Sequence, residues 1–209
     1  MSELINNTQG LGNSWCIVSP GISFKPYPCC RSTHSGIDAT LHLRKKYKIS
    51  ANEVAAVTCK TSPMTAKIAM HHQPRTGLEG KFSLEYCVAT ALLRGKVSLE
   101  DFTDERVTEA KAQDLLSKVS YLHPKEYSTS GGSLAQEVVI ELKNGTEYSH
   151  RVTFPKGDPK NPMTNKELLA KFRDCATLSL TQLETEQVLD LITELEYLDD
   201  ISRLMEILT

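Results

Sequence analysis

The apolar positions of the chain follow two periods, and segments of the two kinds are interspersed. Over 33–47 and 81–93 apolar side chains recur every three or four residues, which places them on one face of an α-helix. Over 53–60 β-branched residues alternate with others, and this alternation predicts a strand. We expect another helix over 104–117 and a short strand over 118–122.

The clearest strand signal is a hairpin. Residues 136–142 and 147–154 both favour strands, and Asn144-Gly145 lies in the connection between them. Asn-Gly is typical of the two-residue type I′ turn, because both residues tolerate a positive φ. The sequence therefore predicts at least one antiparallel pair of strands.

The end of the chain shows only helical patterns. We expect helices over 165–177, 182–195 and 201–208, and each has apolar positions that must be buried against another surface. Strands and helices are mixed before this point without strict alternation. We therefore predict an α+β fold, in which a small antiparallel sheet with packed helices is followed by a C-terminal helical tail.

The chain divides into three parts on this pattern. Residues 1–14 are polar and rich in Asn and Gly, and we expect a loose N-terminal segment. Residues 15–160 form the α+β domain, and residues 161–209 form the C-terminal helices. Within the domain, the Ser- and Gly-rich residues 128–133 predict a flexible loop.

Composition narrows the class of protein. The 209 residues carry a net charge of −2, which gives no global positive field for nucleic acid. No apolar run is long enough to cross a membrane, and the first residues lack the pattern of a signal peptide. The six cysteines lack CxxC spacing, which indicates reduced thiols and a cytoplasmic location. Vicinal Cys29 and Cys30 with His34 suit metal chelation poorly, so we expect no metal site.

The densest group of chemically active side chains lies in the segment 24–34. It contains Lys25, Arg31 and His34 together with two prolines, and a predicted helix follows it. Proline fixes φ and biases the preceding residue away from helix, so this segment should be a stiff extended loop. The N–H groups at a helix N-terminus favour negatively charged ligands. The pattern therefore predicts an anion-binding loop.

This segment, Phe24-Lys25-Pro26-Tyr27-Pro28-Cys29-Cys30 followed by Thr33-His34, resembles the signature of the MmgE/PrpD family. Two later stretches, 80–95 and 157–172, resemble the same family in the same order. The family includes 2-methylcitrate dehydratase, cis-aconitate decarboxylase and iminodisuccinate epimerase. The resemblance covers nearly the whole chain from about Trp15.

The resemblance implies a lid-type α+β domain that, in family members, sits on an all-helical domain. That helical region has no counterpart in this sequence, and the C-terminal helices of relatives pack on it. The resemblance also implies no cofactor, a small di- or tricarboxylate as substrate, and removal of a proton next to a carboxylate. We expect a cofactor-independent lyase, similar to 2-methylcitrate dehydratase, that works with a separate helical half or as a homo-oligomer. The chain alone should be inactive, and the alternative is a truncated remnant without activity or a partner-binding subunit.

The same resemblance implies roles for five residues. Lys25 and Tyr86 match catalytic positions, where Lys25 would bind a carboxylate or donate a proton and Tyr86 would face the cleft. Arg31, His34 and Lys81 would bind the substrate. The alternatives are an exposed lysine at Lys25 and a core tyrosine at Tyr86. Arg31 and Lys81 could equally be surface charges, and His34 could cap or pack beneath the helix that it begins.

Two pairs of neighbouring residues have no predicted chemical role. His71 and His72 precede a proline-containing connection, and we expect an exposed loop there. Cys29 and Cys30 are expected to be small packing residues, because unpaired cysteine is usually buried and inert.

Overall fold

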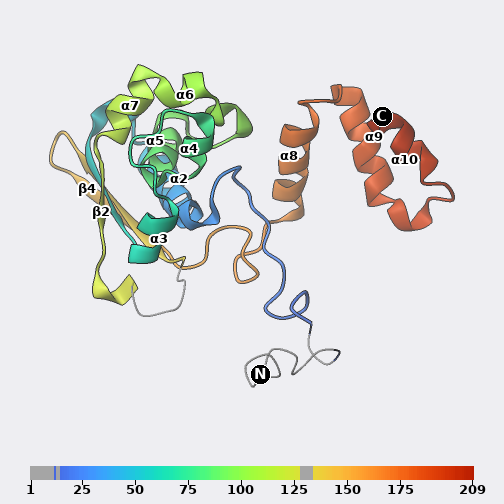
Figure 1. Ribbon diagram of the computed structural model, residues 1–209, viewed down its shortest axis with the longest axis horizontal. Coiled ribbons are helices and arrows are strands. Elements are labelled where there is room, and N and C mark those ends of the chain that lie inside the picture. The colour runs from blue at the N-terminus through green and yellow to red at the C-terminus, as the bar shows by residue number, and fades with distance from the viewer. Residues whose placement is uncertain (1–11, 13–14, 128–133) are drawn as a thin grey trace, which may run out of the picture. The chain divides into compact units, whose positions relative to one another are not determined.

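The computed structural model describes residues 12, 15–127 and 134–209. The expected flexible loop over 128–133 lies outside this range, as does the expected loose N-terminal segment apart from residue 12. The chain forms two compact units, Met1–Met163 and Thr164–Thr209 (Figure 1). Each unit is described separately.

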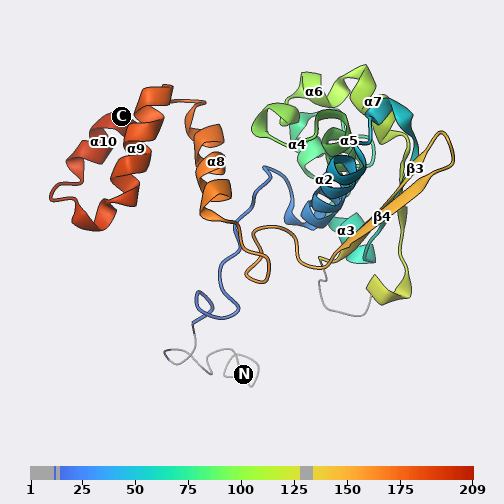
Figure 2. The same ribbon diagram turned by 180° about the vertical axis from the view of Figure 1, so that it is seen from behind.

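The first unit contains a four-stranded sheet with the order β2-β1-β3-β4 (Figure 2). Its strands are β1 (Val54–Lys60), β2 (Val119–Leu122), β3 (Gln136–Leu142) and β4 (Glu147–Val152). β3 pairs antiparallel with β1 and β4, whereas β2 runs parallel to β1. The α+β prediction is confirmed. The sheet is mixed because several helices connect β1 to β2, and such a crossover lets the two strands run in the same direction.

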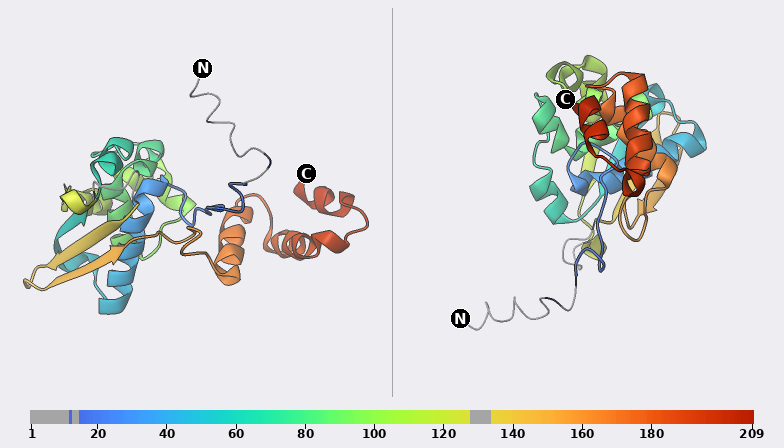
Figure 3. Two further views of the ribbon diagram at one scale, coloured as in Figure 1. Left: turned by 90° about the horizontal axis from the view of Figure 1, so that it is seen from below. Right: turned by 90° about the vertical axis from the view of Figure 1, so that its right-hand side faces the viewer.

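Two helices that pack on the sheet contribute a large share of the core (Figure 3). Helix α2 (His34–Tyr47) packs on β3 and β4, and helix α5 (Leu84–Arg94) packs on α2, α7 and β2. Every residue of α5 from Leu84 to Leu92 is buried, so this helix is the centre of the unit. Burial of apolar surface is the dominant favourable contribution to folding, and α5 takes a large part in it.

Shorter helices surround this centre, and two predicted helices are divided. The helix expected over 81–93 is preceded by a separate helix, and α5 itself begins only at Leu84. The helix expected over 104–117 is broken at Glu109, whose φ and ψ are −56° and 129°. The short helices are α3 (Pro63–Ile68), α4 (Gly77–Lys81), α6 (Asp104–Thr108), α7 (Ala110–Leu116) and the 3₁₀ turns η1 (Arg31–Thr33), η2 (Ala51–Glu53), η3 (Leu99–Phe102) and η4 (Lys125–Tyr127).

The β3–β4 hairpin is confirmed, but its turn is not of type I′. Gly145 has a φ of 82°, whereas Asn144 is not among the described residues with a positive φ. The Leu142 N–H donates to the Thr146 carbonyl at 2.8 Å, and the Gly145 N–H donates to the Leu142 carbonyl at 2.9 Å. The connection is therefore a three-residue loop in which glycine alone takes the left-handed conformation.

The second unit is helical, as predicted. It contains α8 (Asn165–Ala176), α9 (Gln182–Thr193), η5 (Leu195–Tyr197) and α10 (Ser202–Leu208). Capping boxes at the N-termini of α8 and α9 provide hydrogen-bond partners for backbone N–H groups that the helix itself leaves free. Arg173 of α8 forms an ion pair with Glu186 of α9 at 2.6 Å. The unit buries few side chains, which are Thr185, Val188, Leu189 and Leu204.

Candidate active site

The loop that carries Lys25 is held by a turn more than a hundred residues later in the chain. The Phe24 N–H donates to the Gly157 carbonyl at 2.9 Å. The Arg31 guanidinium forms an ion pair with Asp158 at 2.5 Å. The first and third stretches of family resemblance therefore form one surface.

A half-buried carboxylate binds both segments. Asp38, in the second turn of α2, accepts a hydrogen bond from the Tyr27 hydroxyl at 2.6 Å. Its other oxygen accepts the Lys156 N–H, also at 2.6 Å. Burial raises the pKa of Asp38, although both hydrogen bonds act in the opposite direction. Asp38 therefore fixes the two loops relative to the start of α2.

The second stretch of resemblance joins the same region. The Cys30 N–H donates to the Lys81 carbonyl at 2.9 Å, and the His71 N–H donates to the Phe82 carbonyl at 3.2 Å. Lys81, at the end of α4, therefore lies beside the residues that precede Arg31. The three segments meet at the N-terminal ends of α2 and α5.

The structure brings three of the five predicted site residues onto these connected loops. Lys25 is exposed, Arg31 is partly exposed, and Lys81 is half-buried. Arg31 uses one nitrogen for Asp158, and a guanidinium has further N–H donors. The loops therefore present three cations at one end of the first unit.

His34 lies beneath the loops in the core. Its side chain is buried, and its ring meets the ring of Tyr27 edge-on at a centroid distance of 5.2 Å. Its Nε2 lies 3.4 Å from the Cys29 carbonyl. This position agrees with the alternative that His34 packs beneath the loop, where its imidazole supports the loop from below.

Tyr86 is also placed in the core. It is 0% exposed, its hydroxyl donates to the Asp101 carbonyl, and its ring contacts Phe102 edge-on. Burial raises the pKa of Tyr86 to about 12. A side chain in this position matches the core alternative.

The two adjacent cysteines differ in their surroundings. Cys29 is buried, as expected, and its thiol lies 3.2 Å from the Thr33 hydroxyl, whereas Cys30 is half-buried. A hydrogen bond from the Cys87 thiol is the main cause that lowers the pKa of Cys29 to about 5, against the effect of burial. Burial withholds this sulfur from solvent, so it supports the loop from within.

Sequence reasoning missed a histidine–carboxylate pair near these loops. The Nδ1 of His72 lies 2.7 Å from Glu85, whose side chain is 9% exposed, whereas the His72 side chain is 57% exposed. Glu85 also accepts hydrogen bonds from the Tyr121 hydroxyl at 2.5 Å and from the Ser83 hydroxyl at 3.2 Å. This arrangement is typical of an imidazole oriented for proton transfer. Nothing in the sequence indicated this pair. Glu85 lies 13 residues after His72, and Tyr121 lies a further 36 residues along the chain, so only the fold brings the three side chains together.

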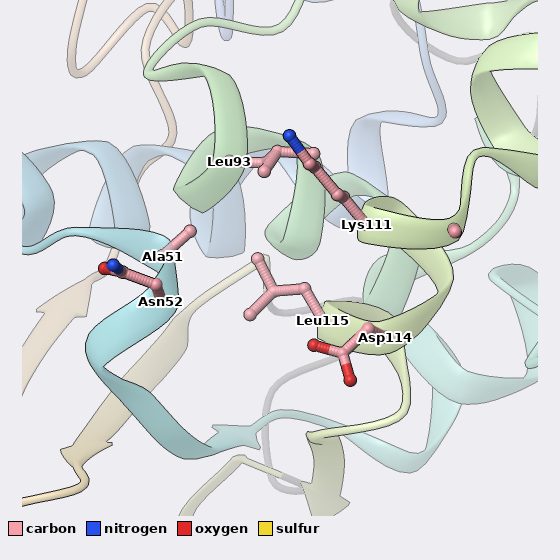
Figure 4. A pocket seen from close by; sticks show the side chains of 7 residues that line it. Ala51, Asn52, Leu93, Lys111, Asp114 and Leu115 are labelled. Carbon is pink, nitrogen blue, oxygen red and sulfur yellow. The ribbon is translucent and has the colours of Figure 1, made fainter.

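A separate cavity of about 380 Å³ lies at the opposite end of α5 (Figure 4). It is mostly apolar and lies between η2, the end of α5 and α7. Its lining includes Ala51, Leu93 and Leu115, with Lys111 and Asp114 at its side. The cavity is therefore distinct from the loops that carry the three cations.

Within the described part of the chain, no group of three His, Cys, Asp or Glu side chains could hold a metal ion. No helix among the described residues is both long and apolar enough to cross a bilayer.

Comparison with known families assigns the chain. The model of the MmgE/PrpD C-terminal domain matches residues 27–196, which is most of the sequence. The matched range includes Arg31, Lys81 and Asp158 and begins two residues after Lys25. The chain belongs to the MmgE/PrpD family.

Individual relatives are cis-aconitate decarboxylases of low identity. The Mus musculus enzyme is 26% identical over 200 residues, which cover 93% of this chain and 41% of the relative. The Aspergillus terreus (strain NIH 2624 / FGSC A1156) enzyme is 27% identical over 210 residues, or 95% of this chain and 42% of the relative. The cis-aconitate decarboxylase-like protein oryM of Aspergillus oryzae (strain ATCC 42149 / RIB 40) is 23% identical over 211 residues, or 97% and 43%. The chain of this MmgE/PrpD member thus spans about two fifths of the length of these relatives.

Proposed function

We propose that the chain is the C-terminal part of a cofactor-independent lyase that acts on a small di- or tricarboxylate. The reaction would begin with removal of a proton next to a carboxylate, as in a 2-methylcitrate dehydratase or a cis-aconitate decarboxylase. The observation that carries the proposal is the meeting of three family-like segments, with Lys25, Arg31 and Lys81, on hydrogen-bonded loops.

The three cations have complementary roles in this proposal. Lys25, which is exposed on the proline-containing loop, contacts one carboxylate and donates a proton or stabilises the enolate-like charge. Arg31 and Lys81 bind the remaining carboxylates through charge-assisted hydrogen bonds. His72, oriented by Glu85, takes up the proton. His34 and Tyr86 support these loops from the core.

The first test measures ligand binding by the complete chain. We expect cis-aconitate, and the unreactive tricarboxylate tricarballylate, to bind, with calorimetry or NMR titration as the measurement. Lys25→Ala and Lys81→Ala should each weaken binding about tenfold, since a hydrogen bond to a charged group contributes about 1.5 kcal/mol or more. Both should change the free energy of unfolding by less than about 0.5 kcal/mol, as surface substitutions do.

The matched control is Lys125→Ala, which removes an exposed lysine from η4. It should leave the affinity for both tricarboxylates unchanged. Equal binding by Lys25→Ala, Lys81→Ala and the unchanged chain would contradict the assignment of these lysines.

The second test measures chemistry. The chain, alone and mixed with the N-terminal part of the mouse relative, is incubated in D2O with cis-aconitate, 2-methylcitrate or iminodisuccinate. The proposal expects deuterium to enter next to a carboxylate, or CO2 to be released, in the mixture. Binding without exchange would support the inactive remnant or partner-binding subunit, and loss of both binding and exchange would refute the proposed function.

A further inference from the structure

Strand β4 has an edge that is open to pairing. The strand order places β2 and β4 at the two edges of the sheet. β2 has four residues and is followed closely by Pro124, whereas β4 has six residues and contains no proline. Proteins usually shield edge strands by such shortening, by proline or by charged side chains, and on β4 the charged residues are one of each sign, Glu147 and Arg151. No described backbone group from another element is hydrogen-bonded to the outer side of β4.

The hydrogen-bond pattern identifies the groups on this edge. The Leu142 N–H donates to the Thr146 carbonyl, so Thr146 bonds toward β3. Along an antiparallel strand, the backbone N–H and C=O groups of successive residues point alternately toward one neighbouring strand and toward the other side. The register between β3 and β4 continues without a bulge to Val152. Glu147, Ser149 and Arg151 therefore direct their N–H and C=O groups away from β3.

The side chains of the same three residues lie on the face of β4 away from α2. Aromatic rings of α2 stack on Tyr148 and His150, both with a centroid distance of 3.9 Å, which fixes the face that α2 covers. Side chains alternate between faces, so Glu147, Ser149 and Arg151 lie on the opposite face, and all three are exposed. On that face the Arg151 guanidinium lies over the Tyr127 ring, 4.9 Å from its centroid, and it remains exposed on its outer side. The strand thus presents a negative, a neutral and a positive residue in a row.

We propose that β4 pairs antiparallel with β4 of a second copy of this chain, about a two-fold axis at Ser149. In this register Glu147 lies opposite Arg151 of the second copy, and the reverse pair forms on the other side of the axis. All outward N–H and C=O groups of the three residues are then bonded. Opposite charges directly across two strands stabilise the pair, and a self-complementary patch suits a two-fold interface.

Other registers lose this match. A shift by two residues places Glu147 opposite Ser149 or Thr153 of the second copy, and both charge pairs disappear. A shift by one residue would place Tyr148 or His150 opposite an outward-bonding residue of the second copy. The N–H and C=O groups of Tyr148 and His150 are already hydrogen-bonded to β3, so they could not form bonds across the interface. The charge pattern therefore selects one register.

The position of α2 is compatible with this pairing. α2 packs on both β3 and β4. Strands are about 4.8 Å apart, so helices centred between β3 and β4 in each copy would be separated by about 10 Å. Helices pack at about 8–10 Å, and the two copies of α2 would therefore lie side by side.

Sedimentation velocity over a concentration series tests the proposal on the complete chain. The unchanged chain should form dimers. Glu147→Arg and Arg151→Glu each place like charges opposite one another, and each should weaken dimerisation about tenfold or more. The double variant, Glu147→Arg with Arg151→Glu, restores opposite charges and should dimerise nearly as well as the unchanged chain.

The controls carry the same changes in charge elsewhere on the surface. Glu100→Arg and Lys96→Glu alter exposed residues outside the sheet and should leave the dimer intact. A chain that stays monomeric, or a double variant that fails to recover, would overturn the proposal.

A cross-link separates this interface from any other self-association. Ser149→Cys is made in a chain whose exposed Cys16 and Cys175 are changed to serine. A short thiol-reactive cross-linker should join two copies at residue 149, because the axis places these residues opposite each other. The matched variant Thr153→Cys should not cross-link, and dimers that cross-link only through Thr153→Cys would refute the register.

Discussion

His71 and His72 are adjacent in sequence but differ in their contacts. The ring of His72 is held by Glu85, which Tyr121 and Ser83 also contact. His71 contributes a backbone hydrogen bond to the Phe82 carbonyl. This difference supplies a matched pair of variants for the proposed proton transfer.

We expect His72→Gln to lower deuterium exchange into the carboxylate substrate at least about tenfold, since general acid–base catalysis contributes roughly 10²–10⁴ in rate. His71→Gln should leave exchange unchanged. Proton NMR of the substrate in D2O measures both. If both variants lost activity in proportion to their stability, His72 would have a structural role only.

The side-chain direction of single residues was the part of the site that sequence could not predict. The resemblance predicts catalytic positions at both Lys25 and Tyr86, yet Lys25 is exposed and Tyr86 is fully buried. A helical period gives the face on which Tyr86 lies. It does not show that η3 covers that face and accepts the hydroxyl through Asp101.

At the scale of elements, local signals predicted most of the fold. β1, β3, β4 and the last helices follow from alternation, helical period and capping boxes. The errors arise from tertiary contacts. The break at Glu109 coincides with an ion pair from Arg94 at 2.6 Å and with a hydrogen bond from the Gln113 side chain to the Val107 carbonyl at 2.7 Å. Neither contact can be deduced from the local pattern, because both form only in the folded unit.

The turn that holds the Lys25 loop gives a prediction about an element. A Cβ at Gly157 would lie 1.9 Å from the Phe24 carbonyl oxygen, and φ there is +84°. Gly157→Ala should therefore displace the loop, destabilise the protein by more than about 1 kcal/mol and weaken tricarboxylate binding. Urea unfolding and calorimetry measure the two effects.

Gly145→Ala is the matched control for backbone strain. Gly145 has a φ of +82°, but nothing lies within 4 Å of an added Cβ. This variant should lose about 1 kcal/mol of stability and keep its full affinity for tricarboxylate. Equal effects of the two variants on binding would show that the loop does not depend on contact with Gly157.

At the scale of the whole molecule, the second unit leaves much apolar surface uncovered. Leu183 is 70% exposed and Tyr197 is 83% exposed, and Leu195 and Ile192 are exposed as well. Such a surface is typical of a region that another protein surface covers. This agrees with the proposal that the chain works with a helical part, as its relatives are more than twice as long.

We therefore expect the chain to bind a hydrophobic fluorescent dye through the second unit. Leu183→Glu combined with Ile192→Glu should reduce dye fluorescence strongly, because it places charges on this apolar surface. The control replaces two exposed apolar residues near the start of the chain, Ile17→Glu with Val18→Glu, and should change fluorescence much less. The opposite ranking would place the dye-binding surface in the first unit.

The ion pair between Arg31 and Asp158 joins positions 127 residues apart. Contacts of such long range form late, because closing a long loop costs entropy before any contact offsets it. During refolding, the backbone hydrogen bonds within α2, which are local, should therefore become protected from hydrogen exchange before the proposed anion site forms. Synthesis on the ribosome must pass residue 158 before Asp158 can pair with Arg31. Under the proposed function, a nascent chain stopped earlier would therefore carry the lysines without the ability to retain a tricarboxylate.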